Sequence, residues 1–245
     1  MRAIAAVGRF GIFLGRFTRA SLTHPPPLRR AMVEAWEVGV AALPLLIVIA
    51  AFVGTNLAVQ GHAAFTPIGG QRMVGLFVGL TGVREFAPII AGSMVAAKSG
   101  TQMASEIAIM RTREEIDALE VMGVQPHWYL VTPRFLGIIL AMPAVTILTS
   151  AVIFTAAWAV ATFQLDLNPS TFIEFAESVV SPRDLLLGVF KGTLFGAVIS
   201  LVSTYNGFYS DPGPDGVGES TNRAVVLSAV GCNLLNFLIS QAVYG

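Results

Sequence analysis

Long apolar runs alternate with shorter polar segments along this chain. The first run contains no Asp, Glu, Lys or Arg between Val38 and Gln71. A helix that crosses a membrane needs about 20 mostly apolar residues, so each run of this length predicts one span. The predicted spans are residues 38–58, 73–97, 135–163, 185–205 and 224–244. The pattern therefore predicts an all-α, polytopic membrane protein with five transmembrane helices.

The segments between the predicted spans carry turn-forming and charged residues. Gly and Pro are frequent in residues 61–70 and 206–223, and this composition is typical of loops. Residues 164–184 predict another loop, with a short helix after Asn168. Residues 98–134 form a long polar stretch between the second and third spans.

Composition supports a membrane protein and argues against several other classes. The chain is 54% hydrophobic and 12% charged, whereas soluble domains average about 25% charged residues. Its formal net charge of zero gives no argument for nucleic-acid binding. Cys232 is the only cysteine, which excludes a disulfide framework. The histidines His24, His62 and His127 are far apart in the sequence, so no metal site is predicted.

The N-terminal residues favour an amphipathic helix that lies in the membrane interface. Arg2, Arg9 and Arg16 are seven residues apart and therefore share one helix face. The other face is largely apolar and holds Ile4, Val7, Phe10, Leu14 and Phe17. Such a helix turns its arginines toward anionic headgroups, although an ordinary basic tail has the same charges. The scattered arginines argue against a signal peptide, and the prolines of residues 23–30 should end the helix.

The distribution of Lys and Arg predicts how the chain is oriented. We expect a single domain, with residues 1–30 as the interfacial helix and its linker and residues 31–245 as the transmembrane bundle. With a cytoplasmic N-terminus, the external loops contain only Arg72 and Arg183, and positive charge favours the cytoplasmic side. The cytoplasmic segments then contain Arg2, Arg9, Arg16, Arg19, Arg29, Arg30, Lys98, Arg111, Arg113, Arg134 and Arg223. The N-terminus is therefore predicted to be cytoplasmic and the C-terminus external.

A short charged segment interrupts the apolar chain near its centre. Six of the ten residues in 111–120 are charged. Thr112 and Glu115 have the spacing of a capping box, which predicts the start of a helix. Gly123 suits the position just after a helix end. We therefore expect a helix over residues 113–122, on the cytoplasmic side.

The predicted short helix has one charged and one apolar face. Arg113 and Asp117 are four residues apart and are expected to pair. Ile116, Leu119 and Met122 form an apolar stripe at spacings of three. Two hypotheses fit this pattern: a solvated loop helix, or a helix that packs on the membrane domain and presents its charges to a soluble partner.

Three stretches of the chain have a distinctive pattern. They are EEIDALEVMGVQPHWYLVTPR (residues 114–134), VREFAPIIAGSMVAAKSGTQMASEIAIM (83–110) and YNGFYSDPGPDGVGESTNRAVVLS (205–228). Together they strongly resemble the MlaE/YrbE permease family, the membrane subunits of MCE-type ABC lipid transporters. The chain departs from the usual family pattern at residues 97–101 and at Ala108.

The resemblance implies a permease of the bacterial inner membrane whose coupling helix, here residues 112–123, lies between spans two and three. It implies that two permeases pair, either two copies of this chain or this chain and a sister permease. It also implies that a separate cytoplasmic ABC ATPase docks on the coupling helix and that an MCE-domain protein sits on the outer side. The expected substrate is lipid, with phospholipid the leading choice. The residues expected to contact the ATPase are Arg113, Glu114, Glu115, Asp117 and Glu120.

Three ionisable residues lie inside the predicted spans. Arg84 and Glu85 are near the middle of the second span, and Lys191 is in the fourth. A charge at the centre of a membrane costs at least about 2.5 kcal/mol on insertion scales and marks a candidate functional site. For a lipid permease, we expect Arg84 and Lys191 to attract the lipid phosphate and Glu85 to orient them. The structural alternatives are that Arg84 and Glu85 bridge helices or shape a kink before Pro88, and that Lys191 reaches the interface.

The sequence lacks the motifs of ATP hydrolysis and of common hydrolases. It contains no G-x-x-x-x-G-K-[ST], H-E-x-x-H or G-x-S-x-G pattern. Asp211, Asp215 and Glu219 miss the spacing of a calcium loop. We therefore expect no catalytic residue and no cofactor in this chain, with ATP used by the partner ATPase. The alternatives are an ion-coupled secondary transporter that uses Arg84 and Glu85 as a relay, and a non-transporting membrane scaffold.

Overall fold

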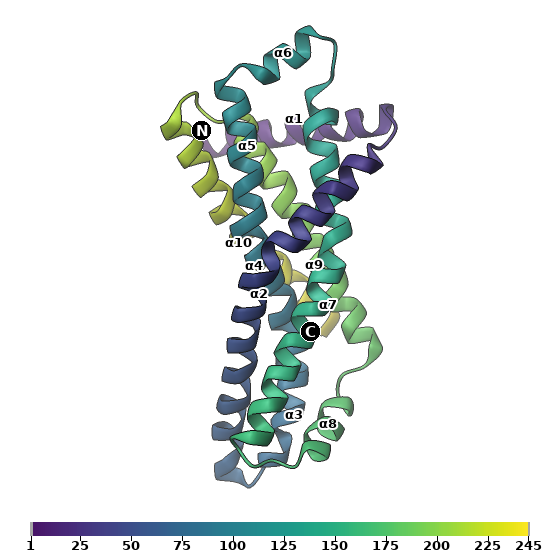
Figure 1. The fold of residues 1–245 in the computed structure, drawn as a ribbon, viewed down its shortest axis with the longest axis vertical. Helices are drawn as coiled ribbons and strands as arrows, with labels where there is room; N and C mark the ends of the chain where they lie inside the picture. The colour runs from purple at the N-terminus through teal and green to yellow at the C-terminus, as the bar shows by residue number, and fades with distance from the viewer. Residues whose placement is uncertain (1, 245) are drawn as a thin grey trace. The chain divides into compact units, whose positions relative to one another are not determined.

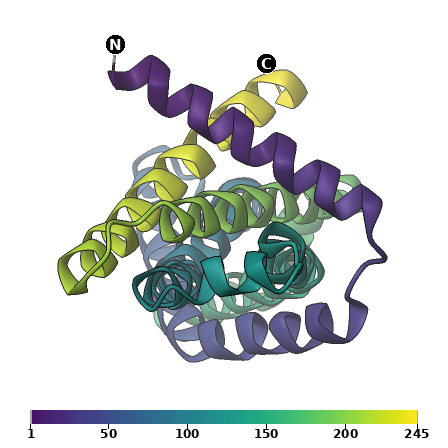
Figure 2. The same cartoon turned by 90° about the horizontal axis from the view of Figure 1, so that it is seen from above.

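The computed structural model describes the backbone of residues 2–244 and the side chains of residues 8–243. Within this part of the chain all regular structure is helical (Figures 1 and 2). The α-helices are α1 (Arg2–Thr23), α2 (Leu28–Phe65), α3 (Val74–Phe77), α4 (Ala87–Val95), α5 (Thr101–Thr112), α6 (Glu115–Val121), α7 (Thr132–Phe163), α8 (Pro169–Glu177), α9 (Pro182–Phe208) and α10 (Pro214–Tyr244). Two 3₁₀ turns, η1 (Thr66–Ile68) and η2 (Gln71–Met73), and three π-helical segments, η3 (Val78–Phe86), η4 (Ala96–Gly100) and η5 (His127–Val131), join them.

Among the residues that the structure describes, five helical stretches are long and apolar enough to cross a membrane. They are Leu28–Ile68, Gln71–Thr112, His127–Phe163, Pro182–Phe208 and Pro214–Val243. The predicted all-α, five-span architecture is therefore confirmed. The second stretch is built from α3, η3, α4, η4 and α5 in succession.

The observed helices extend well beyond the predicted spans. Residues 61–65, predicted as a turn, belong to α2, and residues 98–112, predicted as polar connection, belong to η4 and α5. The predicted loop 206–223 is wrong over most of its length, because α10 begins at Pro214. An apolar run marks only the part of a helix that sits in lipid, whereas the backbone hydrogen bonds continue through polar residues outside it.

The chain divides into two compact units, each assembled from three segments. The first unit contains residues 1–41, 95–141 and 196–232, and the second contains residues 42–94, 142–195 and 233–245. Each unit thus takes a section from each of the five long helical stretches.

Close backbone contacts between helices organise the second unit. A Cβ on Gly54 of α2 would lie 2.3 Å from the carbonyl oxygen of Ile153 in α7. A Cβ on Gly75 of α3 would lie 2.1 Å from the carbonyl oxygen of Phe172 in α8, and α3 and α8 lie side by side (Figure 1). Small residues at such contacts let helices pack tightly where no hydrophobic effect drives them together. The short helix predicted after Asn168 is confirmed as α8, and the Asn168 side chain accepts a hydrogen bond from the Ser170 N–H.

In the first unit, α1 runs across the direction of α5 instead of along it (Figures 1 and 2). Phe13 and Phe17 of α1 are buried in an aromatic and aliphatic cluster, while Arg9 and Arg16 are exposed. This agrees with the predicted amphipathic pattern, of which Arg2, Ile4 and Val7 lie outside the described side chains. The helix ends at Thr23, before three consecutive prolines, as predicted.

Candidate functional site

Lys191 lies in the interior of the second unit and is paired with Glu85. Its side chain is 1% exposed. The Lys191 Nζ donates to Glu85 Oε1 at 2.9 Å and to Ser240 Oγ at 2.8 Å. These contacts connect η3, α9 and α10. The alternative that Lys191 extends to the membrane interface is therefore wrong, because its ammonium group is satisfied inside the unit.

The Glu85 carboxylate accepts further hydrogen bonds from α10. The Asn236 side-chain N–H donates to Glu85 Oε2 at 2.9 Å, and the Ser240 hydroxyl lies 3.0 Å from both carboxylate oxygens. Asn236 and Ser240 are four residues apart and share one face of α10. The Glu85 side chain keeps 31% of its surface exposed, so it is the accessible member of its ion pair.

Arg84 pairs with a carboxylate that sequence reasoning missed. Its Nε lies 2.9 Å from Asp184 Oδ1 and its Nη2 donates to Asp184 Oδ2 at 3.0 Å, which makes the pair bidentate. The same Nη2 donates to the Val179 carbonyl oxygen at 3.2 Å. The Arg84 and Asp184 side chains are 24% and 6% exposed. Two segments separated by 100 residues in the sequence are thus joined in the second unit.

Asp184 also caps the start of α9. Its Oδ2 accepts from the Ser181 N–H at 2.9 Å and from the Ser181 hydroxyl at 2.8 Å. Ser181 precedes the first residue of α9, so the pair has the spacing and the reciprocal contacts of a capping box. The S-x-x-D pattern of residues 181–184 was the sequence signal that could have identified this residue.

The polar network of Arg84, Glu85, Asp184 and Lys191 is balanced in charge and sits among apolar helices. Arg84 and Glu85 do not pair with each other, because neighbouring residues point about 100° apart on a helix. Both instead bridge to α9, Arg84 through Asp184 and Glu85 through Lys191, and Glu85 also reaches α10; helix bridging is what the structural alternative predicted. Both belong to η3, and π-helical segments occur frequently at functional sites. A lipid phosphate at Arg84 would have to compete with the bidentate Asp184.

A short helix, α6, lies where the coupling helix was predicted, with different ends; its coupling role stays a prediction. The proposed capping box is wrong: Thr112 lies in the last turn of α5, where its hydroxyl donates to the Ala108 carbonyl oxygen. The turn into α6 is made by Glu114, which has a left-handed backbone with a φ of 59°. Gly123 ends the helix as predicted, with a φ of 75°. The N–H of Gly123 and that of the next residue donate back into the last turn, which is a Schellman arrangement.

The side chains of α6 divide into one buried anchor and an exposed charged face. Ile116 is 1% exposed and packs in the cluster that contains Phe13. Met122, predicted in the same apolar stripe, is 68% exposed because it follows the helix end. Glu114, Glu115, Asp117 and Glu120 are exposed, as is Arg113 before the helix.

The ion pairs around α6 differ from the predicted one. Arg111 donates to Asp117 Oδ1 at 2.6 Å, and Arg113 lies 3.7 Å from Glu115 Oε1. The predicted pair of Arg113 with Asp117 is wrong, because Arg113 lies outside the helix and has lost the four-residue helical spacing. All four side chains are more than a third exposed, so these pairs contribute about 0–1 kcal/mol each.

Comparison with known proteins gives a consistent result over nearly the whole chain. Residues 31–242 match the family model described as Permease MlaE. A probable ABC transporter permease protein of Rickettsia prowazekii is 32% identical over 238 residues, covering 96% of this chain and 91% of the relative. The intermembrane phospholipid transport system permease protein MlaE of Haemophilus influenzae is 26% identical over 245 residues, covering 98% and 92%. The chloroplast protein TRIGALACTOSYLDIACYLGLYCEROL 1 of Arabidopsis thaliana is 31% identical over 213 residues, covering 87% of this chain and 61% of the relative.

Proposed function

The chain belongs to the MlaE permease family, and on that premise we propose that it is the membrane subunit of an ATP-driven phospholipid transporter. In this proposal the energy comes from a separate ABC ATPase, and an MCE-domain protein on the outer side exchanges lipid with the permease. The substrate class is suggested by the Haemophilus influenzae relative, whose name describes intermembrane phospholipid transport. The chain itself contributes the lipid path and the docking surface.

The observation that carries the proposal is the exposed charged face of α6. One buried residue, Ile116, fixes the helix to the first unit, and the charged residues around it are left at the surface. A helix of seven residues is marginal without such an anchor. We propose that Arg113, Glu114, Glu115, Asp117 and Glu120 contact the ATPase. Movement of the ATPase would then reach the permease through the packing around Ile116.

We propose that the polar network of the second unit meets the lipid headgroup. Arg84 and Glu85 keep exposed surface, whereas Lys191 is enclosed. A headgroup would therefore contact Arg84 and Glu85 directly, and Lys191 would act by holding the Glu85 carboxylate. A phosphate that displaces Asp184 from Arg84 would form a bidentate pair of the same kind. The network would thus provide a polar binding site for the headgroup among otherwise apolar helices.

The proposed arrangement in the membrane follows from charge and family. We propose that the protein lies in the bacterial inner membrane, with its N-terminus and α6 on the cytoplasmic side and its C-terminus outside. Two permeases would pair, either as two copies or as this chain and a sister permease. The cytoplasmic position of α6 is the one that an ATP-hydrolysing partner requires.

A second candidate function is ion-coupled transport. The pair of Glu85 and Lys191 places an acid and a base 2.9 Å apart inside candidate spans, and such pairs occur in proton relays. This candidate requires no ATPase, so dependence on the ATPase separates the two functions.

Native mass spectrometry of the complex tests the proposal. The chain is tagged, purified from its own membranes in mild detergent and weighed with its bound components. We expect two permease chains together with a Walker-motif ATPase and phospholipid. Recovery of the chain without any ATPase, at detergent concentrations that preserve its own fold, would contradict the proposal.

A further inference from the structure

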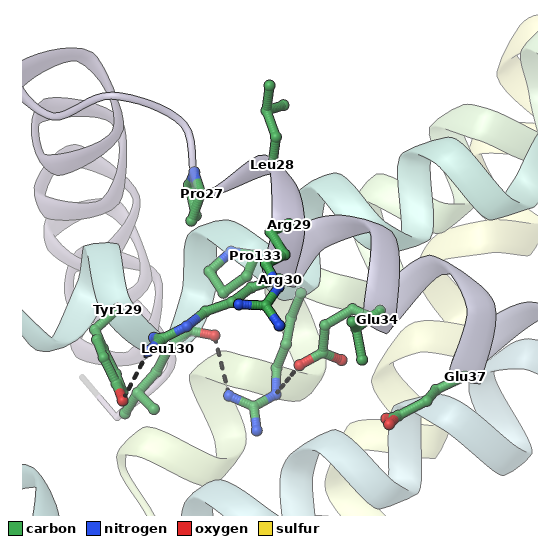
Figure 3. A pocket seen from close by; sticks show the side chains of 11 residues that line it. Pro27, Leu28, Arg29, Arg30, Glu34, Glu37, Tyr129, Leu130 and Pro133 are labelled. Carbon is green, nitrogen blue, oxygen red and sulfur yellow. Dashed lines mark hydrogen bonds and ion pairs between the residues drawn. The ribbon is translucent and has the colours of Figure 1, made fainter.

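A groove in the first unit lies at the start of α2, and its lining shares no residue with either of the sites described above. It has a volume of about 690 Å³. One wall comes from the first turns of α2 and the other from η5 and the beginning of α7 (Figure 3). Its lining residues fall within two segments of the first unit, residues 27–37 and 129–134.

Arg30 is held in this groove by an aromatic side chain. Its guanidinium carbon lies 4.0 Å from the centre of the Tyr129 ring, and its Nη2 donates to the Tyr129 hydroxyl at 3.1 Å. Figure 3 shows the Arg30 side chain extended along the groove toward Tyr129. Such stacking fixes the orientation of a guanidinium, whose other N–H groups remain able to donate to an anion. The groove therefore presents an oriented cation at its surface.

Deeper in the groove, one arginine is paired with two carboxylates. Arg134 is 10% exposed and lies 2.9 Å from Glu106 Oε2 and 3.8 Å from Glu34 Oε1. Its Nη1 also donates to the Leu130 carbonyl oxygen at 3.0 Å. This leaves Arg30 and its exposed neighbour Arg29 as the basic groups at the rim. Glu37, the remaining carboxylate of the lining, lies at the far end of the groove from Tyr129 (Figure 3).

An exposed apolar strip adjoins the basic rim. Leu28, Met32, Val33 and Trp36 are 63%, 66%, 53% and 72% exposed. They line a second hollow of about 560 Å³, and Leu28, Val33 and their neighbour Arg29 line the groove as well. The strip lies at the start of the first candidate span. The surface is therefore basic at the Tyr129 end and largely apolar at the other, where Glu37 lines both hollows as its one carboxylate; an amphiphilic ligand has the same division.

We propose that this groove binds an anionic phospholipid of the surrounding membrane. The phosphate would pair with Arg30 and Arg29, and the acyl chains would lie along Met32, Val33 and Trp36. Arg and Trp are the residues that contact headgroups at the ends of spans, and clustered basic residues there favour anionic lipids. The proposal requires only that the chain spans a membrane, so it holds whether or not the transported substrate is a phospholipid.

Lipid titration of the purified protein tests this site. Native mass spectrometry in detergent compares binding of phosphatidylglycerol with that of phosphatidylcholine, for the wild type and for the variants Arg30→Gln and Tyr129→Phe. We expect the wild type to prefer phosphatidylglycerol and Arg30→Gln to weaken that preference about fivefold, which corresponds to the loss of one basic residue near a membrane surface. Tyr129→Phe should have a smaller effect, because it keeps the ring under Arg30 but loses the hydroxyl contact.

The matched control is Arg72→Gln, which removes an exposed arginine of η2 outside the groove. An unchanged lipid preference in Arg30→Gln, or an equal loss in Arg72→Gln, would overturn the proposal. Trp36→Ala should weaken binding of both lipids, because it shortens the apolar strip. If Trp36→Ala instead separates paired permease chains and leaves lipid binding intact, a second copy occupies this face and the proposal is wrong.

Discussion

Replacing Lys191 with methionine is expected to lower the stability of the protein by about 2–4 kcal/mol. The substitution removes the cation that pairs with Glu85, and losing one partner of a buried ion pair costs about 3–5 kcal/mol. The Glu85 side chain is 31% exposed and keeps its contacts with Asn236 and Ser240. The expected loss of stability is therefore near or below the lower end of that range of about 3–5 kcal/mol. The measurement is equilibrium unfolding in detergent, compared with the wild type under the same conditions.

The double variant Glu85→Gln with Lys191→Met is the control for this prediction. A neutral glutamine can still exchange hydrogen bonds with Asn236 and Ser240, so no uncompensated charge is left inside the protein. We expect the double variant to recover at least half of the lost stability. Equal loss in the single and double variants would show that the ion pair is not the cause. If the stable double variant also loses bound phospholipid, the result supports a headgroup role for the network.

Reversing the charges of α6 is expected to detach the ATPase without unfolding the permease. In the variant Glu115→Lys with Asp117→Lys, two exposed acids of the proposed docking surface become basic. Each takes part only in an exposed ion pair, whose loss costs about 0–1 kcal/mol. We expect the amount of co-purified ATPase to fall at least tenfold. The expected loss is this large because like charges placed across an interface repel and also slow association.

The matched control reverses Glu174 and Glu177 of α8 to lysine. Both are exposed acids on a short helix, and the predicted topology places α8 on the external side. The control changes the net charge by the same amount and should leave the ATPase bound. Full retention of the ATPase by the α6 variant would contradict the proposal that α6 is part of the docking surface.

The five spans could be predicted from the sequence because lipid demands long apolar stretches. The ends of the helices could not, because polar residues continue a helix once it leaves the lipid. Residues 98–112 illustrate this, because the helical backbone continues from η4 through Lys98 into α5 without a break. The prediction of where α6 starts was wrong for a local reason. Glu114 adopts a left-handed backbone, so α6 begins after it and Thr112 belongs to α5 instead of capping α6.

The sequence predicted the charged residues of the candidate site within the spans but not the residues that pair with them. Arg84, Glu85 and Lys191 were conspicuous because charges are rare in spans. Their partners come from segments about 100 to 155 residues away, and no local pattern reports such pairing. Asp184 does have a local sequence signal in its S-x-x-D spacing from Ser181, although it lies at the end of the predicted loop 164–184.

Phospholipid transfer by the reconstituted complex tests the central claim most directly. The permease and its co-purified ATPase are placed in vesicles that contain an isotope-labelled phospholipid, and transfer to an outer-side acceptor is followed with and without ATP. The account predicts transfer that requires ATP hydrolysis, fails in the α6 charge-reversal variant and persists when ion gradients are collapsed. Transfer that proceeds without the ATPase and follows an ion gradient would contradict it.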